Sequence, residues 1–406
     1  MAEYKKTIIF FFLSYILLGS FLSLNNGISH DQYHEQLNWQ INIQAIKGVL
    51  FDFDNYQILK DYLDRYHGIA FHYLSQPFQF ILGSVVSEIN QSTDTGGIYI
   101  SRHLPNFIIF SISGIYFFSI CKYVSNNFNY SLICSILYLI YPYLFGHAQI
   151  NAKDIPFLSF WIIATYYLFS FIDKLHNHKK IFLRDIIIFS FITSYLISIR
   201  ISGTLILLEY FIALLIFVNF KKISIITFFK ENIFLLINFI FFSLCFIYIL
   251  NPILWFDPLE MLNSLKWMSK YYHDTCTLTL GDCMRATNLP SSYIFIWLFF
   301  KLPIIILLGL LIFPFVEKKV VNNKLNSVYY LTALLTAISI IFLLILRNVS
   351  LYDEIRHVMF LLPLVFLVAL YNLYLFNKKL FYILSFFTII FFIFENISLK
   401  KYQYTW

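Results

Sequence analysis

Runs of about twenty apolar residues recur along almost the whole chain, and they limit the possible folds more than any other feature. A helix that crosses the hydrocarbon core of a bilayer needs roughly 20 mostly apolar residues, and it pairs its backbone polar groups within itself. Of the 406 residues, 59% are hydrophobic and only 13% are charged, which is far from the composition of soluble globular proteins. The chain is therefore predicted to be an all-α, polytopic membrane protein.

About eleven transmembrane helices are predicted from these runs, and together they form one domain over residues 1–406. The first run is too long for a secretory signal peptide, and no small-residue cleavage site follows it, so we expect it to remain in the protein. The spans are placed at residues 7–25, 104–123, 129–146, 156–173, 182–199, 202–219, 233–250, 293–316, 327–346, 357–376 and 380–397.

Lysines at alternate ends of these spans predict which side of the membrane each connection occupies. Cytoplasmic connections carry more lysine and arginine than external ones. This rule makes the N-terminus and the connections at 174–180 and 317–325 cytoplasmic, and it leaves two long external loops at 26–101 and 251–292. The lysines at the predicted cytoplasmic ends of the spans then explain the net charge of +7. No basic run has the aromatic interleaving expected for a nucleic-acid partner.

The first external loop contains many acids and two stretches with helical periodicity. These stretches, DQYHEQLNWQINIQAIKGVLF and GIAFHYLSQPFQFILGSVVSEI, are typical of helices that lie in the membrane interface. Asp31 comes soon after the first span, and its carboxylate is able to accept a proton from a hydroxyl group. We therefore expect chemistry at the external membrane surface, framed by interfacial helices.

A short external turn before the fourth span reads GHAQINAKDIPF, residues 146–157. In a purely structural interpretation, Asp154 caps the following helix and Lys153 stays in water. Alternatively, Asp154 and Asp31 face one cavity rimmed by cations from other external helix ends. Arginines are unexpected on this side of the membrane, so they indicate an anionic ligand such as a phosphate. The polar residues of this turn and of the other helix ends are His147, Asn151, Lys153, Asp154, Arg102, His103, Arg200, Arg356 and His357.

Several stretches between residues 25 and 363 resemble, in order and spacing, motifs of the lipid-dependent glycosyltransferases of the GT-C fold. The resemblance is strongest to the bacterial branch related to protein O-mannosyltransferases (glycosyltransferase family 39) and aminoarabinose transferases. GISHDQYHEQLNW resembles an acidic first-loop motif, with Asp31 at the Asp position and Gln32 where Glu is usual. The other stretches are RHLPNF (102–107), FGHAQINAKDIPF (145–157), RISG (200–203), CTLTLGDCMRATNLPSSYIFIWLFFKLP (276–303) and YDEIRHVMFLLP (352–363).

The resemblance implies an inverting hexosyl- or mannosyltransferase that uses a polyprenyl-phosphate sugar at the outer face of the bacterial cytoplasmic membrane. Asp31 is the expected general base, and Asp154 is expected to orient the acceptor or a neighbouring cation. The acceptor is a protein, a lipid or a glycan. No cofactor is required, and Gln32 weakens the case for a divalent metal. The expected donor-phosphate ligands are Lys153, Arg102, Arg200 and Arg356, supported by His103, Asn151, His147 and His357.

Cys276 and Cys283 are seven residues apart in the second external loop, where the compartment permits disulfides, and we expect them to be bonded. A zinc site there is disfavoured, because His273 is near but no fourth ligand is evident. The other cysteines, Cys121, Cys134 and Cys245, fall in or at the ends of apolar spans, where cysteine behaves as a small hydrophobic residue.

Two other functions remain open at this point. A transporter or flippase of a lipid-linked sugar would line its path with Glu209, Asp154 and the arginines, but the spans contain few ionisable residues and no internal repeat is evident. A polymerase or ligase of surface polysaccharide would share the external site and the lipid donor.

Overall fold

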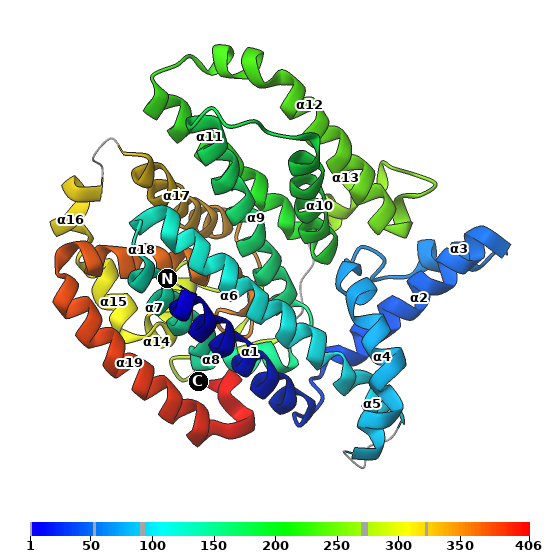
Figure 1. Ribbon diagram of the computed structural model, residues 1–406. Coiled ribbons are helices and arrows are strands. Elements are labelled where there is room, and N and C mark those ends of the chain that lie inside the picture. Colours follow the sequence, from blue (N-terminus) through cyan, green and yellow to red (C-terminus); the bar gives the residue numbers. More distant parts are fainter. Residues whose placement is uncertain (1, 52–53, 90–93, 269–274, 321–323) are drawn as a thin grey trace.

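The computed structural model describes residues 2–51, 54–89, 94–268, 275–320 and 324–406. The chain is nearly all-α, with 81% of its residues in helices, and the described residues contain one two-stranded sheet. The N-terminal part comprises α1 (Ala2–Leu24), α2 (Asp31–Phe51), α3 (Asp54–Asp61), α4 (Ala70–Ile89) and α5 (Asp94–Ser101). In Figure 1, α2 to α5 form a lobe at one side of the helix bundle.

The bundle itself begins with α6 (His103–Ser125), α7 (Phe128–Ile140), α8 (Pro142–Ile150), α9 (Asp154–His176) and α10 (Leu183–Ile199). It continues with the short 3-10 helix η1 (Ile201–Leu205), α11 (Ile206–Lys221), α12 (Ile225–Leu250), η2 (Pro252–Leu254) and α13 (Glu260–Met268). After the strands β1 (Cys276–Thr279) and β2 (Asp282–Arg285) come α14 (Tyr293–Lys301), α15 (Ile304–Leu311), α16 (Phe313–Val320), α17 (Leu325–Leu346), η3 (Arg356–Leu361), α18 (Leu362–Phe376), α19 (Lys378–Leu399) and η4 (Lys400–Thr405).

Seven helices in the described ranges are long and apolar enough to cross a membrane, and two bent helix pairs raise this number to nine. This finding supports the predicted class, a polytopic helical membrane protein. The predicted spans at 7–25 and 182–199 correspond to α1 and to α10, which has only 17 residues. The total of eleven spans therefore remains a prediction.

Two of the predicted spans, at 129–146 and 293–316, are each divided into two helices at a proline. α7 and α8 meet at 57° where Tyr141 precedes Pro142, and α14 and α15 meet at 120° where Leu302 precedes Pro303. A proline disfavours helical torsions in the residue before it, and Leu302 accordingly has an extended conformation with φ −74° and ψ 134°. The prediction of one helix over 293–316 is therefore wrong, because the chain changes direction after Lys301.

The helices differ strongly in how much of their surface the protein covers. In the most apolar windows of α9 and of the η3–α18 segment, 78% and 89% of the residues are buried, against 11% in α12 and 17% in α19. α12 and α19 lie at the edge of the bundle in Figure 1. Their exposed apolar side chains suit contact with lipid, whereas α9 and α18 form the packed interior.

Charged residues mark two opposite ends of this bundle. At one end, Asp154 at the start of α9 forms ion pairs with Arg200, directly after α10, and with Arg356 at the start of η3. At the other end, Lys221 of α11 donates to the carbonyl oxygen of His176 at the end of α9. Because α9 has 23 residues, these ends lie about 34 Å apart. The residues predicted to be external and Lys221, predicted to be cytoplasmic, therefore lie at opposite ends of the bundle, and which end is external stays a prediction.

The lobe contacts the bundle closely at the charged end that contains Asp154. A Cβ atom at Gly68 would lie 2.2 Å from the carbonyl oxygen of Ser198, so the segment before α4 lies directly against the end of α10. α4 buries His72 and Gln79 and exposes Phe80 and Ile81. This inverted polarity suits a helix whose outer face contacts lipid, as expected for an interfacial helix.

Candidate functional site

Asp154 is the centre of a buried charge cluster that joins α9, α10 and η3. Its Oδ1 atom lies 2.7 Å from Arg200 Nη1, and its Oδ2 atom lies 2.6 Å from Arg356 Nε. The side-chain amide of Asn151 donates to Oδ2 at 2.9 Å. Each carboxylate oxygen therefore has a cationic partner, which stabilises a charge at this buried position.

At the start of α9, the side chain that accepts hydrogen bonds from the backbone is that of Asn151, which lies just before the helix. Asn151 Oδ1 accepts hydrogen bonds from the backbone N–H groups of Lys153 and Asp154, at 3.2 and 2.9 Å. N–H groups at the start of a helix have no carbonyl partner within the helix, so a side-chain oxygen such as that of Asn151 stabilises them. Asp154 lies in the first turn of α9, as the structural interpretation expects, but Asn151 accepts from the backbone there and the Asp154 carboxylate pairs with the arginines.

Arg356 brings the two predicted aspartates to one guanidinium group. Its Nη2 atom donates to Asp31 Oδ2, its Nε atom donates to Asp154, and its Nη1 atom donates to Asp353 Oδ2 at 3.2 Å. Asp31 is the first residue of α2, so the lobe contacts the bundle directly through this bond. Its side chain is 45% exposed, whereas that of Asp154 is 3% exposed. Of the two, Asp31 alone offers an open carboxylate.

Lys153 lies in a second cluster with an acid that was not singled out as a site residue. Its Nζ atom lies 3.0 and 3.2 Å from the carboxylate oxygens of Glu35 and 3.1 Å from the carbonyl oxygen of Gly68. An ammonium group has three N–H donors, and these contacts occupy them. Lys153 therefore does not face an open donor site as expected. It ties α9 to α2 and to the segment before α4.

His72 completes this second cluster. Its Nε2 atom lies 3.3 Å from Glu35 Oε2, and its ring stacks on Trp39 with centroids 5.5 Å apart. Burial lowers the pKa of His72 to about 4, helped by the charge of Arg102 and opposed by Glu35. Burial alone would raise the pKa of Glu35, but Lys153 and His72 bring it well below its ordinary value. The cluster therefore holds an ionised Glu35 beside a neutral His72 near neutral pH.

Arg102 and His103 also lie in the interior and not at an opening. The Arg102 side chain is buried and donates to Gln36 of α2. His103 contacts the carbonyl oxygen of Ser23 at 3.0 Å and the side-chain amide of Gln32. The expectation that Arg102 lines a common cavity with Asp31 does not hold, since the packing of α2 against the start of α6 covers its guanidinium group.

The two other predicted histidines lie beside the Asp154 cluster. His147 Nδ1 lies 3.3 Å from the Asn151 amide nitrogen, and its ring packs edge-on against Tyr143. His357 directly follows Arg356, and its ring packs edge-on against Tyr352 at 4.3 Å. Both therefore support the cluster through packing.

Three acids were not predicted as site residues, and two of them had a signal in the sequence. Glu35 follows Asp31 by four residues, which places both on one face of a helix. Asp353 precedes Arg356 by three residues and pairs with it. The neighbouring Glu354 pairs with Lys301 at 2.6 Å, and this contact joins α14 to the charged end of the bundle.

The charges of the Asp154 cluster do not cancel. Arg200 and Arg356 contribute two positive charges, while Asp31, Asp154 and Asp353 contribute three negative ones. In the described part of the chain, no group of three or more His, Cys, Asp or Glu side chains is placed to hold a metal ion. The cluster can accept a proton at Asp31, and it presents Arg200, whose side chain is partly exposed, to an anion.

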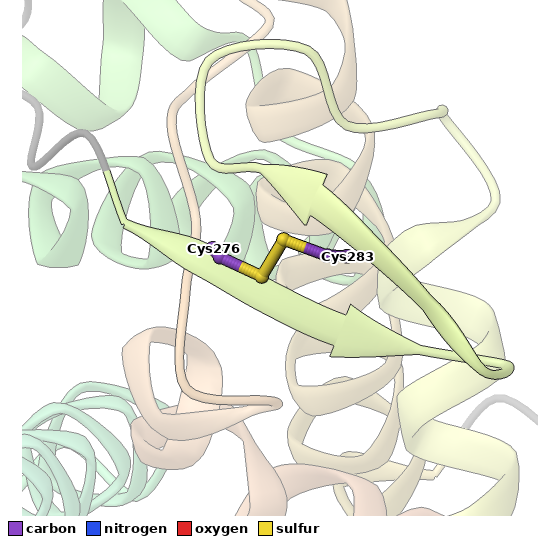
Figure 2. Close-up of a disulfide and its surroundings, with 2 residues drawn as sticks. All are labelled: Cys276 and Cys283. Carbon is purple, nitrogen blue, oxygen red and sulfur yellow. A yellow bond between two sulfur atoms is a disulfide. The ribbon is translucent and has the colours of Figure 1, made fainter.

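Cys276 and Cys283 form a disulfide within the hairpin of β1 and β2, as Figure 2 shows. The turn residues Leu280 and Gly281 both have positive φ, at 53° and 92°, which is typical of the tight turns that join two antiparallel strands. Trp297 of α14 donates its indole N–H to Thr279 at 3.2 Å, so the hairpin also contacts α14. His273, considered as a zinc ligand, lies outside the described residues.

The fold and the site together define a class, a helical membrane protein with a charged site where the lobe meets one end of the bundle. No family model matches the chain, and no curated protein matches it either. The resemblance to the GT-C glycosyltransferases therefore rests on the sequence motifs alone.

Proposed function

We propose that the protein is a membrane glycosyltransferase that moves a sugar from a polyprenyl-phosphate donor to an acceptor hydroxyl, with Asp31 as general base. The observation that carries this proposal is the position of Arg356, which holds an open carboxylate, Asp31, beside a buried one, Asp154. A general base must reach the proton that it accepts. The exposure of the Asp31 side chain at the junction of the lobe and the bundle supports this role.

In the proposed step, the acceptor oxygen attacks the anomeric carbon of the sugar while the bond from that carbon to the donor phosphate breaks. Asp31 takes the acceptor proton, and the lipid phosphate leaves with the bonding electron pair. Attack opposite the leaving group inverts the anomeric configuration. Negative charge grows on the phosphate, and Arg200, the more exposed of the two arginines in the cluster, would stabilise it.

Asp154 acts in this proposal as a positioning residue. It has no open oxygen for an acceptor, because Arg200, Arg356 and Asn151 surround its carboxylate. Its charge holds the two guanidinium groups at the site. Fixed donors of this kind need no reorganisation during the reaction, which is the main source of electrostatic catalysis.

Lys153 and Arg102 position the base through helix α2. Lys153 binds Glu35, and Arg102 binds Gln36, one turn after Asp31 on the same helix. These contacts anchor the start of α2 from two directions. We therefore assign them to the orientation of Asp31 and not to the donor phosphate.

The test is sugar transfer by purified protein from a labelled polyprenyl-phosphate sugar. Asp31→Asn keeps the size of the side chain but cannot accept the proton, so turnover should fall by roughly 10²- to 10⁴-fold. The control is Asp61→Asn, the same change at an exposed acid of the lobe whose carboxylate accepts a hydrogen bond from Gln57. Near-normal turnover in Asp31→Asn, or equal losses in both variants, would refute the role of Asp31.

A further inference from the structure

We infer that a groove between the disulfide-bonded hairpin and α14 holds the prenyl chain of the lipid donor. The cavity there has a volume of about 400 Å³. It is lined mainly by Leu280, Ile296, Trp297, Phe300, Lys301 and Trp406. The identity of the headgroup rests on the proposed function, whereas the apolar character of the groove comes from these residues.

The surroundings of the groove indicate that its mouth faces lipid. Leu278 and Leu280 on the hairpin and Phe300 on α14 are all exposed. A cluster of large apolar side chains on one surface is unfavourable in water and marks a site of contact with lipid or protein. Tryptophan is enriched at membrane interfaces, and Trp297 lies in the wall of the groove. A chain within the bilayer can therefore enter from the side.

The groove is connected to the candidate site by a short series of ion pairs. Lys301 lies in its wall and pairs with Glu354 at 2.6 Å. The preceding residue, Asp353, pairs with Arg356, which also binds Asp31. A lipid whose phosphate lies near the arginines would thus direct its chain past Lys301 into the groove. The sparse polar lining disfavours a glycan or a polar peptide as the occupant.

The walls of the groove are held in place by several contacts. The disulfide closes the hairpin, and the hydrogen bond from Trp297 to Thr279 attaches it to α14. At the other side, Lys301 Nζ donates to the carbonyl oxygen of Trp406, whose ring packs edge-on against Tyr141 at 5.2 Å. Because these contacts order the side chains before the ligand binds, binding does not have to offset the loss of their conformational entropy.

The experiment uses farnesyl phosphate with a photoreactive group near the end of its chain, added to the full chain in lipid nanodiscs. Cross-linked peptides are mapped by mass spectrometry. We expect labelling within residues 276–301, competition by unlabelled farnesyl phosphate, weaker competition by farnesol, and none by inorganic phosphate. Trp297→Ala should reduce labelling roughly tenfold, the loss expected when one large apolar contact is removed. Trp297→Phe, which keeps an apolar ring, should retain most of it.

Phe299→Ala is the matched control, because Phe299 is an exposed aromatic residue of the same helix that is not among the groove residues. Leu280→Ser at the hairpin turn is the second variant if Trp297→Ala does not fold. Labelling outside 276–301, or equal labelling of Trp297→Ala and Phe299→Ala, would overturn the groove assignment. Groove labelling in a wild-type protein without transferase activity would leave the groove in place and refute the proposed function. Sugar transfer by a protein that is labelled outside residues 276–301 would support the proposed function and refute the groove assignment.

Discussion

Replacement of Asp154 by Asn should destabilise the protein more than the same change at any other acid of the site. Asn preserves the shape of the side chain but removes the charge that neutralises Arg200 and Arg356. One of its two terminal atoms also becomes a donor, and it then points toward a guanidinium group that can only donate. Two cations therefore lose their buried partner at once.

The expected magnitude follows from burial. Removal of one partner from a buried ion pair typically costs about 3–5 kcal/mol, because an uncompensated charge remains. Asp353→Asn is the internal control, since Asp353 also pairs with Arg356 but its side chain is 59% exposed. An exposed pair contributes about 0–1 kcal/mol. The same Asp→Asn change at these two partners of Arg356 should therefore lower the free energy of unfolding by amounts that differ by at least about 2 kcal/mol.

The free energy of unfolding is measured by titration with sodium dodecyl sulfate in mixed micelles, with circular dichroism as the signal. The double variant Asp154→Asn/Arg356→Gln should cost less than the sum of the single changes, with a coupling energy of about 0.5–3 kcal/mol. Free energies of unfolding of Asp154→Asn and Asp353→Asn that agree within about 0.5 kcal/mol, a difference typical of surface substitutions, would contradict a buried ion pair at Asp154.

Three further predictions concern other parts of the molecule. A topology reporter at residue 178 should be cytoplasmic and one at residue 280 external, and an external location of residue 178 would reverse the assigned sidedness. Glu209 is buried and accepts hydrogen bonds from an indole N–H and a threonine hydroxyl, both at 2.8 Å. In Glu209→Gln the amide oxygen can still accept from the indole N–H, and the new NH2 group can donate to the threonine hydroxyl, so stability should be preserved. Glu209→Leu should cost about 1–3 kcal/mol. In a transporter that uses this acid, Gln would abolish transport. The pKa of His72 is lowered from 6.5 to about 4 in the folded protein, so between these pH values the imidazole is protonated only in the unfolded chain. The free energy of unfolding should therefore fall by up to about 3 kcal/mol as the pH drops from 6.5 to 4. His72→Gln should reduce this slope, and an unchanged slope would contradict the shift.

Proximity within the chain made part of the site predictable. Asn151, Lys153 and Asp154 occur in one short turn, and Arg356 and His357 occur together before another span. Their polarity contrasts with the apolar runs beside them. The sequence left open whether Asp154 caps α9 or faces the cations of the site. The structure decides between these roles, because Asn151 accepts the hydrogen bond from the backbone at the start of α9.

Partners from distant segments could not be predicted. Lys153 was expected to face a phosphate, yet it binds Glu35, which is 118 residues away. Arg102 was expected at an opening, yet α2 covers it. Both outcomes depend on how the lobe packs against the bundle. No local pattern encodes that packing, because many orientations of α2 would satisfy its own periodicity equally well.

The sequence by itself determined the class of this protein and the residues available for chemistry. Apolar runs of transmembrane length and lysines at alternate ends are local properties, because the bilayer acts on each segment separately. Only the tertiary structure decided which charges pair. It assigned Arg356 to Asp31 and Asp154, assigned Lys153 to Glu35, and turned the chain between Lys301 and Pro303 within a segment predicted as one span. Ion pairing depends on distances of a few ångströms between side chains from different helices, and those distances exist only after the helices have packed.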